Sequence, residues 1–169
     1  ASSDVNDVNL FLASAFAGTE GAALYVVRSS GDATRIKTEL QARSITAVTT
    51  VGVIDSAVTN ALIGASIPVR NITGASASDL SQKLADETNS TSASGVVLVS
   101  AQEPSAWPLA VNVAARAAKP LLLVDDAALS PETAQWLTAF APDSITIVGT
   151  SAYVPDSVVA GFDNPSRLN

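Results

Sequence analysis

The chain contains an internal repeat with a period of about 97 residues. Residues 12–52 align without a gap to residues 109–149, and the aligned segment begins with Leu-Ala and ends with Val-Gly in both copies. Between these ends, Leu24 matches Leu121 and Leu40 matches Leu137. A repeat of this period indicates one supersecondary unit used twice, which favours an array with a binding or scaffolding role over a single catalytic pocket.

Six short apolar runs predict β-strands, at residues 23–27, 45–51, 68–72, 96–99, 121–124 and 145–148. The runs are unbroken and do not alternate between polar and apolar residues. Both faces of their sheet should therefore be covered, as in a parallel sheet between layers of helices.

Helical signals lie between these strands. Residues 130–132 (SPE) supply an N-cap, a first-turn proline and a first-turn acid, and Ser76 with Asp79 opens another helix. Asp55 and Asp156 each open a short helix beyond a strand that ends in Val-Gly. Small apolar residues predict two tightly packed helices, residues 9–20 and 106–118. This alternation predicts a doubly wound α/β fold, with a mainly parallel sheet, helices on both faces and an internal repeat.

Composition excludes several classes of function. The 16 acidic and 9 basic residues give a net charge of −7 without a basic stripe, which disfavours binding to nucleic acid. No apolar run approaches the roughly 20 residues of a membrane span, so we expect no membrane insertion. The chain lacks methionine and starts with Ala-Ser-Ser, which suggests signal-peptidase processing and export. Asn71 and Asn89 each open an Asn-x-Ser/Thr sequon and are candidate glycosylation sites.

The catalytic repertoire of the sequence is small. There is no His and no Cys, so the commonest general base, transition-metal ligand and thiol nucleophile are missing. The glycines form no GxGxxG or P-loop pattern, and no G-x-S-x-G elbow occurs. We therefore expect no catalytic residues, no cofactor, no metal site and no enzymatic activity.

Polar residues at the ends of the predicted strands are the remaining candidates for a ligand site. Asp125 and Asp126 directly follow the strand at 121–124, and paired acids at the carboxyl edge of a parallel sheet could hold a divalent cation. The simpler interpretation is that they solvate and cap the loop to Ser130. The first copy has Arg28 at the equivalent place, which argues against a metal site. Further candidates at strand ends are Ser100, Gln102, Thr150 and Ser151.

Several segments of the second copy together resemble the cell wall-binding repeat 2 family of bacteria and archaea. They are residues 96–100 (VVLVS), 104–110 (PSAWPLA), 117–123 (AAKPLLL) and 145–149 (ITIVG). Residues 69–74 (VRNITG) echo the strand that opens this family's repeat. The sequence departs from the family pattern where Ser105 replaces the acid of a D-A-L turn, Thr150 a second glycine and Ala77 an arginine.

The resemblance implies a secreted, non-catalytic α/β module that is used in tandem to attach surface proteins to an anionic cell-wall polymer. In the family's phase, residues 1–68 are the later part of a first repeat, and residues 69–169 are a complete second repeat plus the start of the next. Ser105 joins the ligand-binding candidates as the counterpart of the family's acid. The negative net charge opposes polymer binding, since it would repel a polyanion.

The sequence thus favours a secreted cell-surface module that anchors to, or assembles on, the polymer of the cell wall or envelope. One alternative is a small-ligand or calcium-binding receptor, or an enzyme, that uses the strand-end crevice. Another is a self-assembling surface-layer or filament subunit. The first copy has only residues 1–8 in place of three family elements, so its sheet should lack strands and carry an unpaired edge. Self-association or neighbouring repeats of a longer protein would cover that edge.

Overall fold

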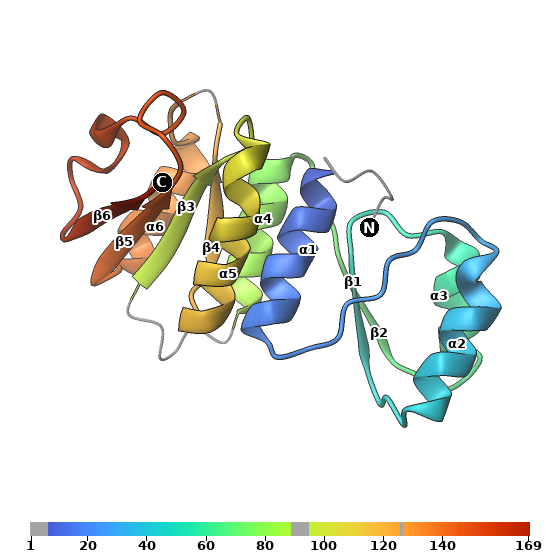
Figure 1. Ribbon diagram of the computed structural model, residues 1–169. Helices are drawn as coiled ribbons and strands as arrows, with labels where there is room; N and C mark the ends of the chain where they lie inside the picture. The colour runs from blue at the N-terminus through green and yellow to red at the C-terminus, as the bar shows by residue number, and fades with distance from the viewer. Residues whose placement is uncertain (1–6, 89–94, 126) are drawn as a thin grey trace.

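The structure is a computed structural model that describes residues 7–88, 95–125 and 127–169. Helices and strands alternate along most of the chain (Figure 1). The helices are α1 (Val8–Thr19), α2 (Asp32–Ala42), α3 (Ser56–Ile63), α4 (Ala77–Glu87), α5 (Trp107–Ala117) and α6 (Pro131–Phe140), with short 3₁₀ helices η2 (Pro104–Ala106) and η3 (Asp156–Val159). The strands are β1 (Val48–Val51), β2 (Val69–Ile72), β3 (Gly95–Ser100), β4 (Leu121–Val124), β5 (Ser144–Val148) and β6 (Pro165–Leu168).

The strands form two sheets, a four-stranded sheet in the order β4-β3-β5-β6 and a two-stranded sheet of β1 and β2. Every pair of named strands runs parallel. The larger sheet belongs to the second copy of the repeat and the smaller sheet to the first. The predicted α/β fold with a mainly parallel sheet is confirmed.

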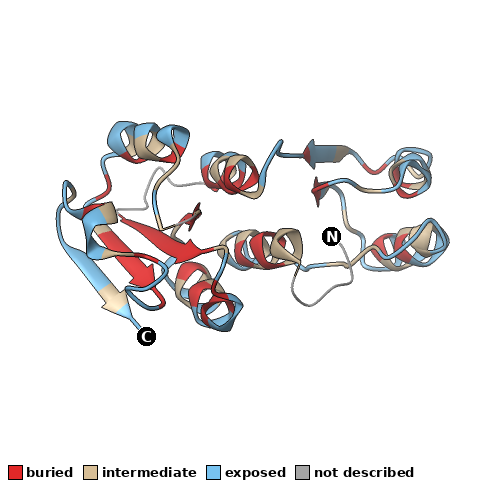
Figure 2. Ribbon diagram, turned by 90° about the horizontal axis from the view of Figure 1, so that it is seen from above, coloured by how far each residue is buried: buried red, intermediate tan, exposed pale blue. Residues whose placement is uncertain are grey.

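Helices cover both faces of the larger sheet. On one face Val97 and Val99 pack with α1, α4 and α5, and on the other Val96 and Leu98 pack with α6 and η3. All four side chains are fully buried, and Figure 2 shows the inner strands of this sheet as buried, with the exposed strand β6 at one edge. Helix α4 also covers the outer edge of β4, where the Ser81 hydroxyl accepts a hydrogen bond from the Leu123 N–H at 3.2 Å. The unbroken apolar strands are thus explained by burial from both sides.

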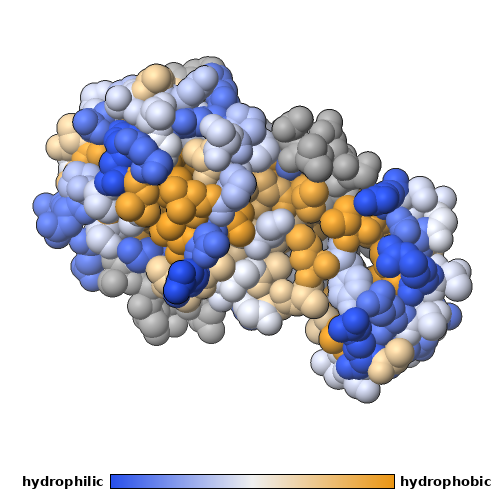
Figure 3. Space-filling model, viewed as in Figure 1, coloured by the Kyte–Doolittle hydropathy of each residue, from blue (hydrophilic) through white to orange (hydrophobic). Residues whose placement is uncertain are grey.

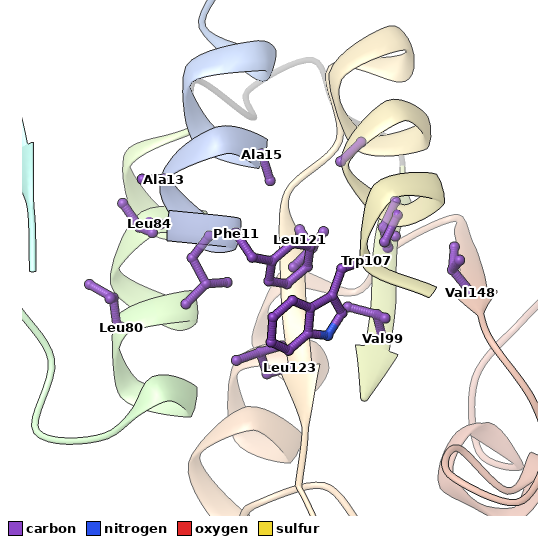
Figure 4. Close-up of a cluster of buried hydrophobic side chains, with 14 of the residues drawn as sticks. Phe11, Ala13, Ala15, Leu80, Leu84, Val99, Trp107, Leu121, Leu123 and Val148 are labelled. Atoms are coloured by element: carbon purple, nitrogen blue, oxygen red, sulfur yellow. The ribbon is translucent and has the colours of Figure 1, made fainter. Parts of the chain in front are cut away.

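The equivalent helices of the two copies, α1 and α5, pack against each other. Small residues allow a close approach, and a Cβ atom added at Gly18 would lie 2.7 Å from the Cβ of Ala115. Phe11 of α1 stacks on Trp107 of α5 with ring centroids 4.8 Å apart (Figure 4). This helix pair joins the first copy to the core of the second.

Gly18→Ala should destabilise the protein by about 1–3 kcal/mol, because the rigid Cβ of Ala115 cannot move aside and the helices must separate. Gly161→Ala is the control, since nothing lies within 4 Å of its added Cβ, and it should change stability by less than about 0.5 kcal/mol. Urea unfolding of both variants tests this. A Gly18→Ala variant as stable as the parent would mean that the helices are not packed this closely.

The observed strands differ from the predicted ones in two places. The strand predicted at residues 23–27 is wrong, since this segment has no regular structure. Its counterpart β4 pairs with β3, and within the described chain no strand lies beside residues 23–27 to provide such a ladder. The sequence analysis also did not identify β6 as a strand, although it pairs with β5 over four residues.

The first copy's sheet is short of strands, as its sequence led us to expect. Among the described residues, β1 pairs with β2 alone. Strand β2 lies at the start of the predicted second repeat, yet it joins the sheet of the first copy, whereas α4 packs on β4. No described helix is long and apolar enough to cross a membrane.

Candidate functional site

The strand-end candidates of the second copy lie at the carboxyl edge of the larger sheet. Ser100 is the last residue of β3 and is only 1% exposed. Its hydroxyl accepts a hydrogen bond from the Gln102 N–H at 3.1 Å, and its carbonyl accepts one from the indole N–H of Trp107 at 3.0 Å. Ser100 is therefore buried, and it fixes the turn after β3.

Asp125 follows β4 and is partly buried. Its Oδ2 accepts a hydrogen bond from the hydroxyl of Ser78 in α4. Asp126, the second acid of the predicted pair, lies outside the described residues. In residues 7–88, 95–125 and 127–169, no group of three or more Asp or Glu side chains could hold a metal ion. The observed role of Asp125 is to connect the loop after β4 to α4.

Glu103 is a residue of this edge that the sequence analysis missed. Its side chain reaches from the loop after β3 to the end of β5, where its Oε2 accepts a hydrogen bond from the Thr150 N–H at 3.0 Å. A Cβ atom added at Gly149, whose φ is +112°, would lie 2.3 Å from the same oxygen. The backbone conformation thus favours glycine here, and a larger residue would also displace the Glu103 carboxylate. The only sequence signal was the Val-Gly turn, which did not indicate what packs against it.

The other candidates at this edge are exposed: Gln102, Ser105, Thr150 and Ser151. Asn71 is also exposed, and its side-chain oxygen accepts a hydrogen bond from the Thr50 hydroxyl at 2.8 Å. Asn89 lies outside the described residues. The strand ends therefore form a network of internal hydrogen bonds with polar side chains around it.

Glu103→Ala should cost about 1–3 kcal/mol of stability, because it leaves the Thr150 N–H without its carboxylate acceptor. Glu103→Gln should recover part of this loss, since an amide oxygen can accept the same hydrogen bond. Ser105→Ala, at an exposed position two residues away, should have an effect below about 0.5 kcal/mol. Thermal and urea unfolding measure all three, and equal stability of Glu103→Ala and Ser105→Ala would contradict the role assigned to Glu103.

One carboxylate in the first turn of α4 has a shifted pKa. The Ala75 N–H, which donates to Asp79 Oδ2 at 2.7 Å, lowers the pKa of Asp79, and Lys83 lowers it further. A lowered folded-state pKa stabilises the protein above the unfolded-state pKa, and this stabilisation is lost as the pH falls through the folded-state value. Asp79→Asn should therefore be less stable than the parent at pH 7, and the difference should shrink below about pH 4. Unfolding curves across pH 2–7 test this, and a difference independent of pH would contradict it.

A large opening lies in the first copy. It is a cavity of about 590 Å³ between the extended segment 22–27, β1 and the C-terminal half of α1, with α2 and α3 on its inner side. Apolar side chains make up most of its wall, and the ion pair of Arg70 with Glu87 contributes charged atoms. Figure 3 shows hydrophobic side chains on the surface between α1 and the two-stranded sheet of β1 and β2.

Comparisons with known proteins place the fold. No protein-family model matches the sequence, and no curated protein matches it. Among solved structures, the chain is similar to Cwp8 from Clostridium difficile, with a TM-score of 0.75 and 15% identity over 95% of this chain. It is also similar to Cwp6 from the same organism, with a TM-score of 0.73 and 16% identity over 90% of this chain. The chain spans 29% of the length of the Cwp8 chain and 25% of the Cwp6 chain.

Proposed function

We propose that this chain is a non-catalytic module of a secreted cell-surface protein, and that it attaches to or assembles on the polymer of the cell wall or envelope. The observation that carries the proposal is the likeness of its fold to Cwp8 and Cwp6, which are cell wall proteins. That likeness extends over nearly the whole chain, so both copies of the repeat take part in it. The tandem repeat itself supports a role in attachment or scaffolding.

The internal hydrogen bonds of the polar residues at the strand ends support a non-catalytic role. Ser100, Glu103 and Asp125 all form hydrogen bonds inside the protein. A catalytic or ligand-binding crevice would instead hold polar groups that converge on an open space.

The charge distribution limits how the module can bind a polymer. The net charge is −7, and basic side chains form ion pairs within the protein: Arg35, Arg43, Arg70, Lys83 and Arg167. Attraction to a polyanion by a broad positive field is therefore weak. We expect attachment through short-range contacts, whose strength depends little on salt.

Co-sedimentation with purified cell envelope tests this function. The chain should pellet with the envelope, and retention should be similar at about 0.15 M and 0.5 M salt because exposed charges contribute little. A second envelope sample, stripped of its anionic polymers, shows whether the polymer itself is the partner. A chain that stays in the supernatant under all conditions would contradict the proposal.

A calcium titration distinguishes this proposal from the main alternative, a calcium-binding receptor. The melting temperature of the parent should not change with Ca²⁺. A saturable increase that is lost in Asp125→Ala would favour a calcium-binding receptor at the strand ends.

A further inference from the structure

The cavity of the first copy lies where the second copy has its central strand. The repeat equates β1 with β5 and residues 24–27 with β4. Strand β2 pairs with β1 as β6 pairs with β5, so these two strands also take equivalent places. The backbone supports this equivalence, since the Gly52 N–H donates to the Ile72 carbonyl at 2.9 Å and the Gly149 N–H donates to the Leu168 carbonyl at 2.8 Å. In the second copy, β3 lies between β4 and β5 and pairs with both.

The first copy has both neighbours of this central strand but, within the described residues, not the strand itself. Strand β1 pairs with β2 on one side, and residues 23–27 pair with no strand. The cavity of about 590 Å³ separates them, and both β1 and residues 22–27 line it. We call this space the strand slot.

Without a central strand, apolar side chains of the first copy are more exposed than their counterparts in the second. Leu24 is 42% exposed, whereas its counterpart Leu121 is 6% exposed under β3. Val27 is only partly buried, whereas its counterpart Val124 is fully buried. The equivalent apolar segment is therefore more open to solvent in the first copy, at a considerable loss of hydrophobic stabilisation.

The backbone of β1 also faces the slot. The Val48 N–H donates to the carbonyl of Pro68, directly before β2, at 3.0 Å, and the Gly52 N–H donates to the Ile72 carbonyl at 2.9 Å. Because successive residues of a parallel strand bond to opposite neighbours, Thr49 and Val51 direct their backbone groups toward the slot. The slot thus combines apolar walls with a row of backbone donors and acceptors, which is the chemistry that recognises an added β-strand.

We propose that the strand slot takes a β-strand parallel to β1, and that residues directly N-terminal to Ala1 in a longer chain begin this strand. The repeat indicates this source, because the six positions that lie 97 residues before Gly95–Ser100 are three positions ahead of Ala1 followed by residues 1–3, which lie outside the described residues. The sequence of β3, Gly-Val-Val-Leu-Val-Ser, indicates the kind of strand that fits. The inserted strand pairs with β1 and gives residues 23–27 the neighbour that they lack. This inference does not depend on whether the module binds the cell envelope.

A peptide with the sequence of β3, flanked by lysines for solubility, is the probe. Added to the ¹⁵N-labelled 169-residue chain, it should slow amide exchange of Thr49 and Val51 at least about tenfold. Exchange at Val48 and Gly52, which already pair with β2, should change much less. A peptide with proline in place of the leucine of β3 is the control, because it lacks one backbone donor, and it should not protect the chain.

Two matched variants locate the binding site. Leu24→Asp places a charge in the slot and should weaken peptide binding at least about tenfold. Leu109→Asp is the control, because Leu109 is exposed to a similar extent, 38% against 42%, but does not line the slot. Equal loss of binding in both variants, or in neither, would overturn the proposal.

A chain with Gly-Val-Val fused directly before Ala1 tests the proposed source. It should show the same protection of Thr49 and Val51 without added peptide, and a higher melting temperature than the parent. No protection by either the peptide or the fusion would overturn the proposal. Protection of the parent chain that rises with its own concentration, together with dimers in light scattering, would overturn it in favour of a second copy as the source.

Discussion

Trp107→Ala should destabilise the protein by about 3–5 kcal/mol, since a large aromatic side chain in a core leaves a cavity that its neighbours cannot fill. Trp107 is 6% exposed, stacks on Phe11 and packs over β3 (Figure 4). It also donates the shorter of two hydrogen bonds to the carbonyl of Ser100, at 3.0 Å against 3.4 Å for the Glu103 N–H. Chemical denaturation followed by circular dichroism measures the loss, because removing Trp107 changes the fluorescence signal itself.

Trp107→Phe separates the two contributions of this side chain. It keeps most of the contact with Phe11 but removes the indole N–H, so that the Ser100 carbonyl keeps only the longer hydrogen bond from the Glu103 N–H at 3.4 Å. Its cost should be about 1–3 kcal/mol. The stacked pair of Trp136 and Phe140 provides a comparison, since Trp136 is only partly buried and Trp136→Ala should cost less than Trp107→Ala. An equal cost at both positions would show that burial in the helix interface does not determine the effect.

Leucine-to-alanine changes at equivalent positions of the repeat should differ strongly. Leu121→Ala should cost about 2–5 kcal/mol, because Leu121 is 6% exposed in the core under α1 and α5. Leu24→Ala should cost less than about 1 kcal/mol, because Leu24 is 42% exposed beside the strand slot. The sequences around both residues are aligned by the repeat, so the local chain is matched.

Urea denaturation of both variants checks this difference. The change in midpoint should be severalfold larger for Leu121→Ala, with no change in slope for either variant. Similar costs would mean that Leu24 is buried in solution, by a strand in the slot or by another molecule.

The fold could be predicted where local sequence and tertiary neighbours agree. The caps at Asp55, Ser76 and Ser130 all accept the backbone N–H bonds that their sequence position predicts. Runs such as Val-Val-Leu-Val in β3 are buried on both faces, so their apolar character alone identified a central parallel strand.

At residues 23–27 the local sequence pattern predicts a strand that the structure does not have. Their sequence is as apolar as that of β4, but a strand also needs a neighbour to complete its hydrogen bonds, and that neighbour is remote in sequence. Tertiary context therefore overrides the local pattern at this segment.

The candidate site was harder to predict than the fold. Ser100, Asp125 and Thr150 were found because parallel strands end at a common edge, and they do lie there. Their partners, Ser78 of α4 and Glu103, come from other parts of the chain, and no sequence spacing relates them to the strand ends. The sequence could place these three residues at the edge, but it could not show which groups from other parts of the chain form hydrogen bonds with them.

The hydroxyl of Ser81 has a consequence for solubility. It occupies the Leu123 N–H at the outer edge of β4, where a foreign strand would otherwise start to add. Replacing Ser81 with alanine would leave this buried N–H without its acceptor and would weaken the packing of α4 on the edge of β4. The cover that α4 gives to β4 thus protects this edge from the addition of a strand from another molecule.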